Sequence, residues 1–480
     1  MREYLIPFFL GTVRMRDRAF LGLVSVALAL AILLVVTIWQ LERGARPAGQ
    51  SLTLYVALTG SDASDGSAAR PWRHLDTAVS RLRPGDRLCV GAGVWTDSRD
   101  VIDTQTNTIP SGTDLGAGAI TIGACNGDVA TLKPPAGLTA VRLTYGAGGT
   151  PHHLVITDLS FDGSLQQENP SSPDGSPELL YTSSGAHHIR FQRLHVAHTL
   201  SHAVQLAGTN ADPNTDTAIE FLDSVLEDIG NAKGDSGHGG PGINNGYAIY
   251  VWTAGARIRG NTFRDNRGTA LVVYGPRNII DGNLFTKNAT RGGAGAYAVN
   301  FGSSSHPVPT GGAFVNNQVI DHPGGGVQVY TGASAIIANN TFAKNPQWAI
   351  HLQYCTAAIV ANNIAQNAAT DVINDSPGSC QLQLASNLPS ATDARFVDAA
   401  AGDYRITADS PAWNAGLTLA QVATDFAGTP RPQAGAYDMG AFEAIASTPP
   451  AGVNYRITAD VTFAPDGTIQ FSGTGVPATR

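Results

Sequence analysis

IANNTFAKNPQWAIHLQYCTAAIVANNIA, residues 337–365, contains one short pattern twice, as IANNTF at its start and as VANNIA at its end. The pattern occurs three more times upstream, as IRGNTF at 258–263, IDGNLF at 280–285 and FVNNQV at 314–319. Its shared Asn recurs at steps of 22, 34, 23 and 23 residues, at Asn261, Asn283, Asn317, Asn340 and Asn363. The basic repeat is therefore about 22 residues, and the long step contains a Gly-rich insertion.

Each repeat carries a second apolar run after a small residue. These runs are AIYVW at 248–252, ALVVY at 270–274, AVNFG at 298–302, GVQVY at 326–330 and AIHLQ at 349–353. A unit this short cannot bury its apolar face alone, whereas coils of two or three strands stacked as a solenoid can. The frame of leucine-rich repeats is absent and propeller blades would be about twice as long. The sequence therefore predicts an all-β parallel β-helix, whose clearest coils span about 150 to 375.

The recurring Asn fits a structural role better than a catalytic one. Asn tolerates the left-handed turn conformation, and stacked amides hydrogen-bond to one another along a fibre or solenoid axis. We therefore expect the five Asn side chains to form one inward ladder, where they could not meet a polymer outside.

The N-terminus contains one apolar stretch long enough to span a membrane, FLGLVSVALALAILLVVTIW at 20–39. Arg14, Arg16 and Arg18 precede it, so the positive-inside rule places residues 1–19 in the cytoplasm and the bulk of the chain outside it. The stretch is long and ends in bulky residues, which favours an uncleaved signal anchor followed by a linker at 40–51, although cleavage near Ala45 or Ala48 stays open.

The exported part is acidic. The whole chain has a net charge of −8, and residues 1–50 contain six Arg and three acidic residues, so the remainder carries −11. This charge argues against nucleic acid as a partner. The four cysteines form no close C-x-x-C pair, so disulfides Cys89–Cys125 and Cys355–Cys380 and free buried thiols are both open.

Two end segments resemble a known family. LYVALTGSDASDGSAARPWRHLDTAVSRLRPGDRLCVGAGVW at 54–95 resembles the N-terminal segment of secreted bacterial right-handed parallel β-helix proteins of the pectate-lyase-like superfamily. DYRITADSPAWNAG at 403–416 and DFAGTPRPQAGAYDMGAFE at 425–443 resemble the segment that closes many such β-helices. The resemblance implies a β-helix domain over 52–445 and a capping helix over 71–83. Lyases, hydrolases, epimerases and proteins without known activity share these segments, so it does not imply one activity.

The apolar face of that helix would be Leu75, Ala78, Val79 and Leu82. Residues 446–480 follow the domain as a linker and a small β segment, with a hairpin expected around Pro465-Asp466-Gly467.

One outward row of the repeats carries side chains suited to sugars. Aligning the coils on their small residue gives the candidate substrate-binding residues Gln205, Tyr250, Asn300 and Gln328, with Val272 among them and His351 at the end; two residues further on stand Trp252, Tyr274, Tyr330 and Gln353. Aromatic faces and amides are the groups that sugars require. An alternative, equally weighted, is that the aromatic side chains stack on one another as a structural ladder.

Two insertions precede strands of this row, at 231–247 and 289–297, and they would form a rim carrying Lys233, Asp235, His238 and Arg291.

A turn row alternates in charge, and its members are His198, Asp228, Asp265, Lys287, Asp321 and Lys344. An exposed ion-pair ladder is the plainer interpretation, and a calcium site or a lyase base is the functional one. In lyases of this fold a Lys, Arg or His removes the proton beside a uronate carboxylate, so Lys287 and His351 are the catalytic candidates.

His152-His153 and His187-His188 look like metal-binding dipeptides. Neighbouring strand residues face opposite sides, so we expect neither dipeptide to chelate one ion, and we interpret them as turn and coil-start residues.

The favoured hypothesis is an extracytoplasmic protein that binds and processes a polysaccharide or cell-envelope glycan, with a lyase acting on a uronate-containing glycan preferred and calcium as the one cofactor considered. The alternative is a non-catalytic surface or envelope protein. A hydrolase of the polygalacturonase kind would need clustered Asp on the outward row, which has none, and an epimerase is less favoured than a lyase.

Overall fold

The computed structural model describes residues 50–444 except 126, 147, 168–177, 184, 209–216, 231–245, 289, 291–296, 303–308, 367–369 and 375–379, together with 7–8, 11–12, 458–463 and 469–474. The chain forms two compact units, Met1–Gln50 and Ser51–Arg480. In the first, β1 (Pro7–Phe8) pairs with β2 (Gly11–Thr12). Among the described residues no helix is long and apolar enough to cross a membrane. The predicted span at 20–39 lies outside them.

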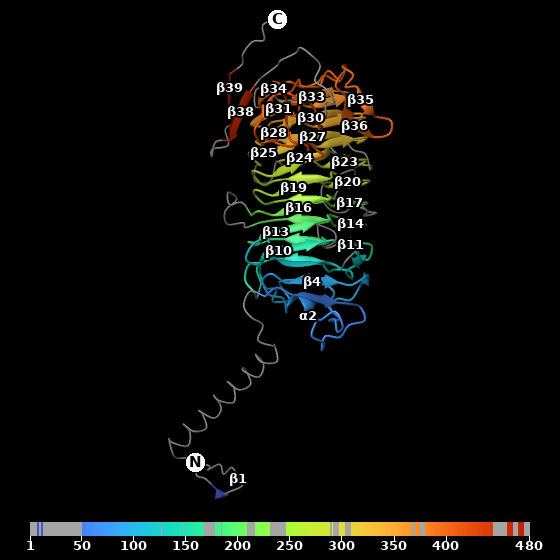
Figure 1. Cartoon of the computed structure of the whole chain (residues 1–480), viewed down its shortest axis with the longest axis vertical. Coiled ribbons are helices and arrows are strands. Elements are labelled where there is room, and N and C mark those ends of the chain that lie inside the picture. Colours follow the sequence, from blue (N-terminus) through green and yellow to red (C-terminus); the bar gives the residue numbers. More distant parts are fainter. Residues whose placement is uncertain are drawn as a thin grey trace. The chain divides into compact units, whose positions relative to one another are not determined.

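The second unit is a parallel β-helix with three sheets, whose coils follow one another from β3 to β34 (Figure 1). The first sheet contains β3 (Thr53–Val56), β4 (Arg87–Val90), β7 (Ile120–Ala124), β10 (His152–Thr157), β13 (His187–Gln192), β16 (Glu220–Leu222), β19 (Arg257–Arg259), β22 (Ile279–Asp281), β25 (Gly312–Val315), β28 (Ser334–Ala338), β31 (Ala357–Ala361) and β34 (Gln381–Ala385). The second contains β5 (Gly93–Trp95), β8 (Ala130–Leu132), β11 (Ser160–Asp162), β14 (His195–Ala197), β17 (Val225–Glu227), β20 (Thr262–Arg264), β23 (Leu284–Thr286), β26 (Gln318–Ile320), β29 (Thr341–Ala343) and β32 (Ile364–Gln366). The third contains β6 (Ile102–Asp103), β9 (Val141–Leu143), β12 (Leu180–Thr182), β15 (Val204–Leu206), β18 (Ile249–Val251), β21 (Leu271–Val273), β24 (Tyr297–Phe301), β27 (Gly325–Tyr330), β30 (Trp348–Gln353) and β33 (Thr370–Asn374).

The core fills the inside of the coils. Alternate strand residues point inward, so Phe263 and Phe285 of neighbouring coils stack with ring centroids 4.8 Å apart. A helix forms within the predicted range 71–83, but it is only α2 (Leu75–Val79). Its residues Leu75, Ala78 and Val79, followed by Leu82, are buried in the main core as expected.

The predicted ladder of inward Asn side chains is confirmed. Each of Asn261, Asn283, Asn317 and Asn340 donates from Nδ2 to the Oδ1 of the next, at 2.9 to 3.2 Å, and all are buried. Asn363 continues the ladder to a sixth member, Asn387, at 2.9 Å. The left-handed conformation belongs to the preceding residue instead, as at Asn316, Asn339 and Asn362, where φ is 54° to 56°.

A second ladder, which the repeat pattern had not indicated, lies five residues after the first, at residues 266, 288, 322 and 345. Asn266 donates to Asn288 Oδ1 at 2.7 Å, and Asn345 accepts the backbone N–H of His322 at 3.0 Å. His322 occupies the rung between Asn288 and Asn345. It is fully buried, and its ring approaches the Gly324 backbone without a well-formed hydrogen bond from either nitrogen among the described residues. The ladder is therefore interrupted at His322.

Replacing His322 with Asn should stabilise the protein, by about 1 kcal/mol at neutral pH, because an amide can complete the rung. Burial lowers the pKa of His322 to about 4, from 6.5. At a pH between the folded and unfolded pKa, the unfolded chain binds a proton at His322 that the folded chain does not. The free energy of unfolding therefore falls by about 3 kcal/mol as the pH drops from about 6.5 to 4. Urea unfolding at pH 7.5 and pH 4.5 should show that the advantage of His322→Asn grows at the lower pH. A stability difference between His322→Asn and wild type that is the same at both pH values would contradict the lowered pKa of His322.

Both sequence-near disulfides are formed, which resolves the alternative left open above. Cys89 bonds to Cys125 and Cys355 bonds to Cys380, with Cα atoms 4.9 Å and 4.7 Å apart, and no described cysteine is free. Each bond joins neighbouring coils, one near each end of the β-helix.

The segment after the last coil packs on the outside of the C-terminal coils. It includes β35 (Phe396–Asp398), β36 (Asp403–Ile406) and β37 (Thr418–Leu419), and β37 pairs with β38 (Thr458–Phe463), which forms an antiparallel pair with β39 (Ile469–Thr474). The hairpin expected at 465–467 has its strands on both sides of that turn, which itself lies outside the described residues.

Three apolar clusters join this segment to the coils. One holds Ile336 and Ile359 of the first sheet against Leu419 and Tyr437. The others cover outward residues of the second sheet, such as Ile320. None of the three includes a described residue of the third sheet, and the segment meets that sheet at the Asp371 carboxylate, which accepts the Ser390 N–H at 3.0 Å. We call the outward side of this sheet the third-sheet face.

The outward Asn of each N-N doublet fixes the segment in place. Asn316, Asn339 and Asn362 donate from Nδ2 to the backbone carbonyls of Thr424, Asp438 and Leu417, at 2.9, 3.0 and 2.8 Å. In earlier coils a Gly with positive φ, Gly260 or Gly282, stands at this position and offers no amide. The change from Gly to Asn thus supplies the amides that hold the closing segment.

Candidate functional site

The register predicted for the outward row is confirmed by strand pairing on the third sheet. Each residue pairs directly with the next along Gln205, Tyr250, Val272, Asn300, Gln328 and His351. The pairing continues upstream through three residues that the sequence analysis missed, Tyr181, Arg142 and Asp103. One row therefore crosses nine coils, and it is charged at its N-terminal end and amide-rich and aromatic further on.

The three missed residues lie where the repeat pattern was too weak to align. Arg142 donates to Gln105 Oε1 at 3.2 Å and to Thr139 Oγ1 at 3.1 Å, and it lies 4.0 Å from the Asp103 carboxylate. Among the three, Arg142 is the one whose charge would suit an acidic ligand.

Five ring-bearing side chains form an aromatic cluster on the middle of the face. Tyr250 is central: it stacks on His202 at 5.4 Å and meets Trp252 and Tyr274 edge to face at 5.4 Å and 5.2 Å. Tyr247 stacks on His202 at 4.7 Å, and burial raises the pKa of Tyr247 to about 12. Edge-to-face packing of this kind stabilises the rings against one another.

This packing changes the expectation for Tyr274. The side chain was expected to face outward, either as a sugar platform or as part of an aromatic ladder, and only 8% of it is exposed because Tyr250 and Trp252 pack against it. Tyr250 and Trp252 keep intermediate exposure. The aromatic ladder that was the alternative interpretation therefore exists at this point of the row.

A second group lies on the last coils of the face and comprises His351, Tyr297 and Trp348; we call it the His351 cluster. His351 Nδ1 is 3.1 Å from the Tyr297 hydroxyl, and its ring meets Trp348 edge to face at 5.2 Å. Gly325 lies between the two aromatic rings: a Cβ there would be 2.4 Å from Trp348 Nε1 and 3.0 Å from Tyr297 Cδ1. Only glycine leaves room for both rings, so Gly325 positions the partners of His351. Neither Tyr297 nor Trp348 was among the predicted site residues.

Amide side chains occupy the row between the two clusters. Gln328 donates to Gln353 Oε1 at 3.2 Å, and Tyr330 and Gln353 keep intermediate exposure. Within the described ranges, Asn300 Oδ1 and the Trp348 indole N–H are buried and have no hydrogen-bond partner. An acceptor and a donor on this face are therefore unsatisfied among the described residues.

The two catalytic candidates do not come together. Lys287 is exposed in a left-handed turn between β23 and β24, whereas His351 lies on β30, two coils further along the axis. Two coils correspond to about 10 Å. His351 itself is only 8% exposed.

The turn row of alternating charge is a series of left-handed corners rather than an ion-pair ladder. Its members all have positive φ, between 52° and 60°. Of the charged side chains described here, Asp265, Lys287, Asp321 and Lys344 form no ion pair with one another, and Lys344 instead donates to the Ala399 carbonyl at 2.9 Å. The ion-pair interpretation was therefore wrong for these four residues.

The rim residues Lys233, Asp235, His238 and Arg291 lie outside the described residues. For the residues that are described, no three His, Cys, Asp or Glu side chains converge as a metal site.

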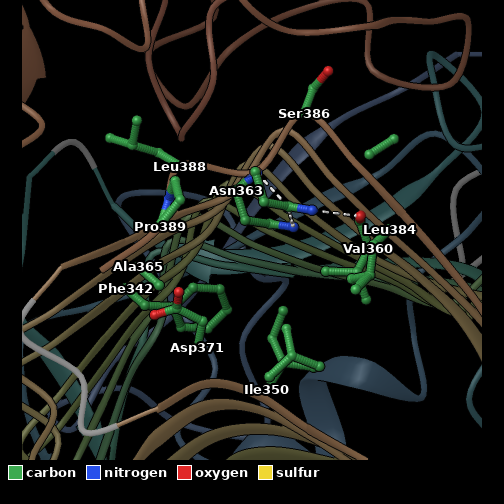
Figure 2. Close-up of a pocket in the computed structure, with 13 residues that line it drawn as sticks. Phe342, Ile350, Val360, Asn363, Ala365, Asp371, Leu384, Ser386, Leu388 and Pro389 are labelled. Carbon is green, nitrogen blue, oxygen red and sulfur yellow. Dashed lines mark hydrogen bonds between the residues drawn. The ribbon is translucent and has the colours of Figure 1, made fainter. Parts of the chain in front are cut away.

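The cavity in Figure 2 is separate from the third-sheet face. It has a volume of about 390 Å³ and is lined by inward residues of the last coils, among them Phe342, Ile350, Val360 and Val372. The ladder ends beside it, where Asn387 donates to the Val360 carbonyl at 2.7 Å. Leu384, which faces inward by its pairing with Val360, is 58% exposed, so the cavity is the unfilled interior at the end of the stack.

The geometry defines a class of protein, and comparison with known families agrees with it. Residues 247–388 match the family model described as a right-handed beta helix region. The protein is a right-handed parallel β-helix, as the sequence predicted. No curated protein matches the chain.

Among solved structures, the chain is similar to the pectate lyase Pel9A, at 14% identity over 84% of this chain and 98% of that one, with a TM-score of 0.46. It is similar to a rhamnogalacturonan lyase at 14% identity over 72% and 90%, with a TM-score of 0.46. A third is the A-module of the mannuronan C-5 epimerase AlgE4 of Azotobacter vinelandii, at 15% identity over 63% and 86%, with a TM-score of 0.40.

Proposed function

We propose that the protein binds an extended polysaccharide along the third-sheet face and cleaves it by elimination at the His351 cluster. The observation that carries the proposal is the continuous row from Tyr250 to His351, on a face of which no described residue belongs to the apolar clusters of the closing segment. The row spans four coil steps, about 19 Å, which suits several sugar residues of an extended chain. Sugar rings need apolar faces and paired donors and acceptors, and this stretch supplies both.

The chemistry proposed is removal of the proton beside a uronate carboxylate. His351 accepts the proton, the electron pair forms the new carbon–carbon double bond, and the glycosidic bond breaks with its oxygen as leaving group. Tyr297 orients the imidazole through Nδ1, at 3.1 Å. The amides of Asn300 and Gln328 lie on the adjoining strands and stabilise the negative charge that develops on the carboxylate.

The proposal includes the cell location. Residues 20–39 would anchor the chain in a membrane with the β-helix outside the cytoplasm, and α2 would close the N-terminal end of the core. Two disulfides support this location, because such bonds persist mainly in oxidising compartments.

A second candidate is a non-catalytic envelope protein that binds a glycan or serves as a stalk. Its support is that the aromatic side chains pack on one another and that His351 is largely buried by Tyr297 and Trp348. A structural face of this kind would need no turnover.

The purified full-length chain in detergent should release unsaturated products from at least one uronate polysaccharide, measured by ultraviolet absorbance across pectate, alginate and glycosaminoglycans, with and without calcium.

His351→Ala should lower kcat at least a hundredfold and leave binding intact, because a proton-transfer group acts on the transition state. Tyr330→Ala should weaken glycan binding with little loss of stability.

His198→Ala and Tyr145→Ala serve as controls, since both residues are exposed and lie on coils N-terminal to the stretch from Tyr250 to His351. Absence of product on every substrate would reject elimination, and glycan binding in that case would favour the second candidate. Unchanged binding in Tyr330→Ala would reject the groove itself.

A further inference from the structure

Four histidines lie together at the start of two adjacent strands of the first sheet. They belong to a different sheet from the row between Tyr250 and His351, and to coils N-terminal to it. His152 begins β10 and pairs directly with His187, which begins β13. The neighbours His153 and His188 have positive φ, 54° and 52°, and the pairing passes over them. The strand alternation therefore does not hold here, and the expectation that each dipeptide points its rings to opposite sides is wrong.

Within each dipeptide the two rings meet through the same atom. His152 Nδ1 is 2.8 Å from His153 Nδ1, and His187 Nδ1 is 2.7 Å from His188 Nδ1. Between the coils, His152 stacks on His187 at 5.0 Å and His153 lies 4.7 Å from His188. We call these four residues the histidine cluster.

Neutral imidazole is the form that binds a metal, and an ordinary imidazole is mostly neutral at pH 7. Without a metal, one shared proton in each dipeptide bridges the two nitrogens. All four side chains keep intermediate exposure, so an ion can reach them.

The nitrogen separation places both donors within reach of one ion. The two Nδ1 atoms of each dipeptide lie 2.8 Å and 2.7 Å apart, the length of the hydrogen bond that joins them without a metal. The choice of ion rests on ligand chemistry: the affinity of nitrogen ligands for divalent ions rises to Cu²⁺ and falls again at Zn²⁺, and Cu²⁺ accepts a site with two nitrogens and water.

We propose that each dipeptide of the histidine cluster chelates Cu²⁺ through its two Nδ1 atoms. The ring that holds the bridging proton on Nδ1 takes the Nε2–H tautomer instead, so that both Nδ1 lone pairs face the ion. Because no three ligating side chains converge on one point in the described part of the chain, the unit of binding is the pair, and water completes the coordination. Two divalent ions about 5 Å apart repel strongly, so one ion per chain binds first and a second binds at least a hundredfold more weakly.

The test is calorimetric titration of the full-length protein with CuCl2 and with ZnCl2, together with electron paramagnetic resonance of the copper form. Wild type should bind one Cu²⁺ per chain, at least tenfold more tightly than Zn²⁺, with a spectrum showing two imidazole nitrogens. His153→Asn and His188→Asn should each still bind one ion, and the double variant should bind none.

Asn accepts a left-handed conformation, so these variants should fold, and melting temperatures check this. His198→Asn is the matched control, because His198 is also exposed with positive φ, 60°, and lies outside the cluster. Copper binding that survives in the folded double variant, or that is lost equally in His198→Asn, would overturn the proposal. Zn²⁺ binding as tightly as Cu²⁺ would also overturn it.

Discussion

Replacing Arg431 with methionine should lower the free energy of unfolding by about 3 to 5 kcal/mol. Arg431 is buried in the closing segment and donates to Glu443 Oε1 at 2.6 Å, to the Gly440 carbonyl at 2.9 Å and to Asn316 Oδ1 at 3.2 Å. Methionine fills much of the volume but leaves the Glu443 carboxylate buried without its counter-charge. Urea unfolding measures the loss.

The loss should depend on pH. Burial, with repulsion from Glu443, raises the pKa of Asp438 to about 7, and burial also raises the pKa of Glu443. Protonated carboxyl groups need no counter-charge, so Arg431→Met should cost less at pH 5 than at pH 8. The same change at Arg405, whose ion pair with Asp403 is exposed, is the control and should have no measurable effect. Equal losses for the two variants would contradict the role of Arg431.

Replacing Asn340 with alanine should cost about 4 kcal/mol, because one amide serves four partners in the core. Asn340 Oδ1 accepts the backbone N–H of Asn317 at 2.8 Å and its amide at 3.2 Å. Its Nδ2 donates to the Phe314 carbonyl at 2.8 Å and to Asn363 Oδ1 at 2.9 Å. Alanine leaves the Asn317 backbone N–H and the Phe314 carbonyl without their amide partner, and it removes one hydrogen bond from each of the Asn317 and Asn363 side chains, which keep their bonds to the Ile280 carbonyl and the residue-340 N–H.

Asn107→Ala is the control, because Asn107 lies in a loop and its amide donates to the hydroxyl of the adjacent Thr106, at 3.1 Å, in an exposed contact. The urea midpoint should fall strongly for Asn340→Ala and barely for Asn107→Ala. A small change in the first would mean that the ladder adds little beyond apolar packing.

Much of the fold followed from spacing alone. The repeat of about 22 residues, the inward ladder and the register of the outward row depend on strand alternation and on turns of fixed length, which a single sequence displays. The register held from Gln205 to His351 because those coils differ only by insertions outside the strands.

The sequence-based predictions that failed depended on local backbone conformation or on contacts between distant segments. Positive φ at His153 and His188 brought together rings that alternation would separate. Tyr297 and Trp348 reach His351 from strand starts at a corner, where alternation gives no direction. The N-N doublets did carry a signal, since the Asn that stands in place of Gly at the turn supplies the amide that holds the closing segment.

The two disulfides sit near opposite ends of a stack in which each coil touches only its neighbours. Such a stack ordinarily frays from its termini inward, because a terminal coil has one neighbour rather than two. Here Cys89–Cys125 joins the coils that contain β4 and β7, and Cys355–Cys380 joins those that contain β31 and β34. The covalent bonds hold the coils near both ends together. We therefore expect the coils in the middle, beside the insertions, to separate first when the protein unfolds.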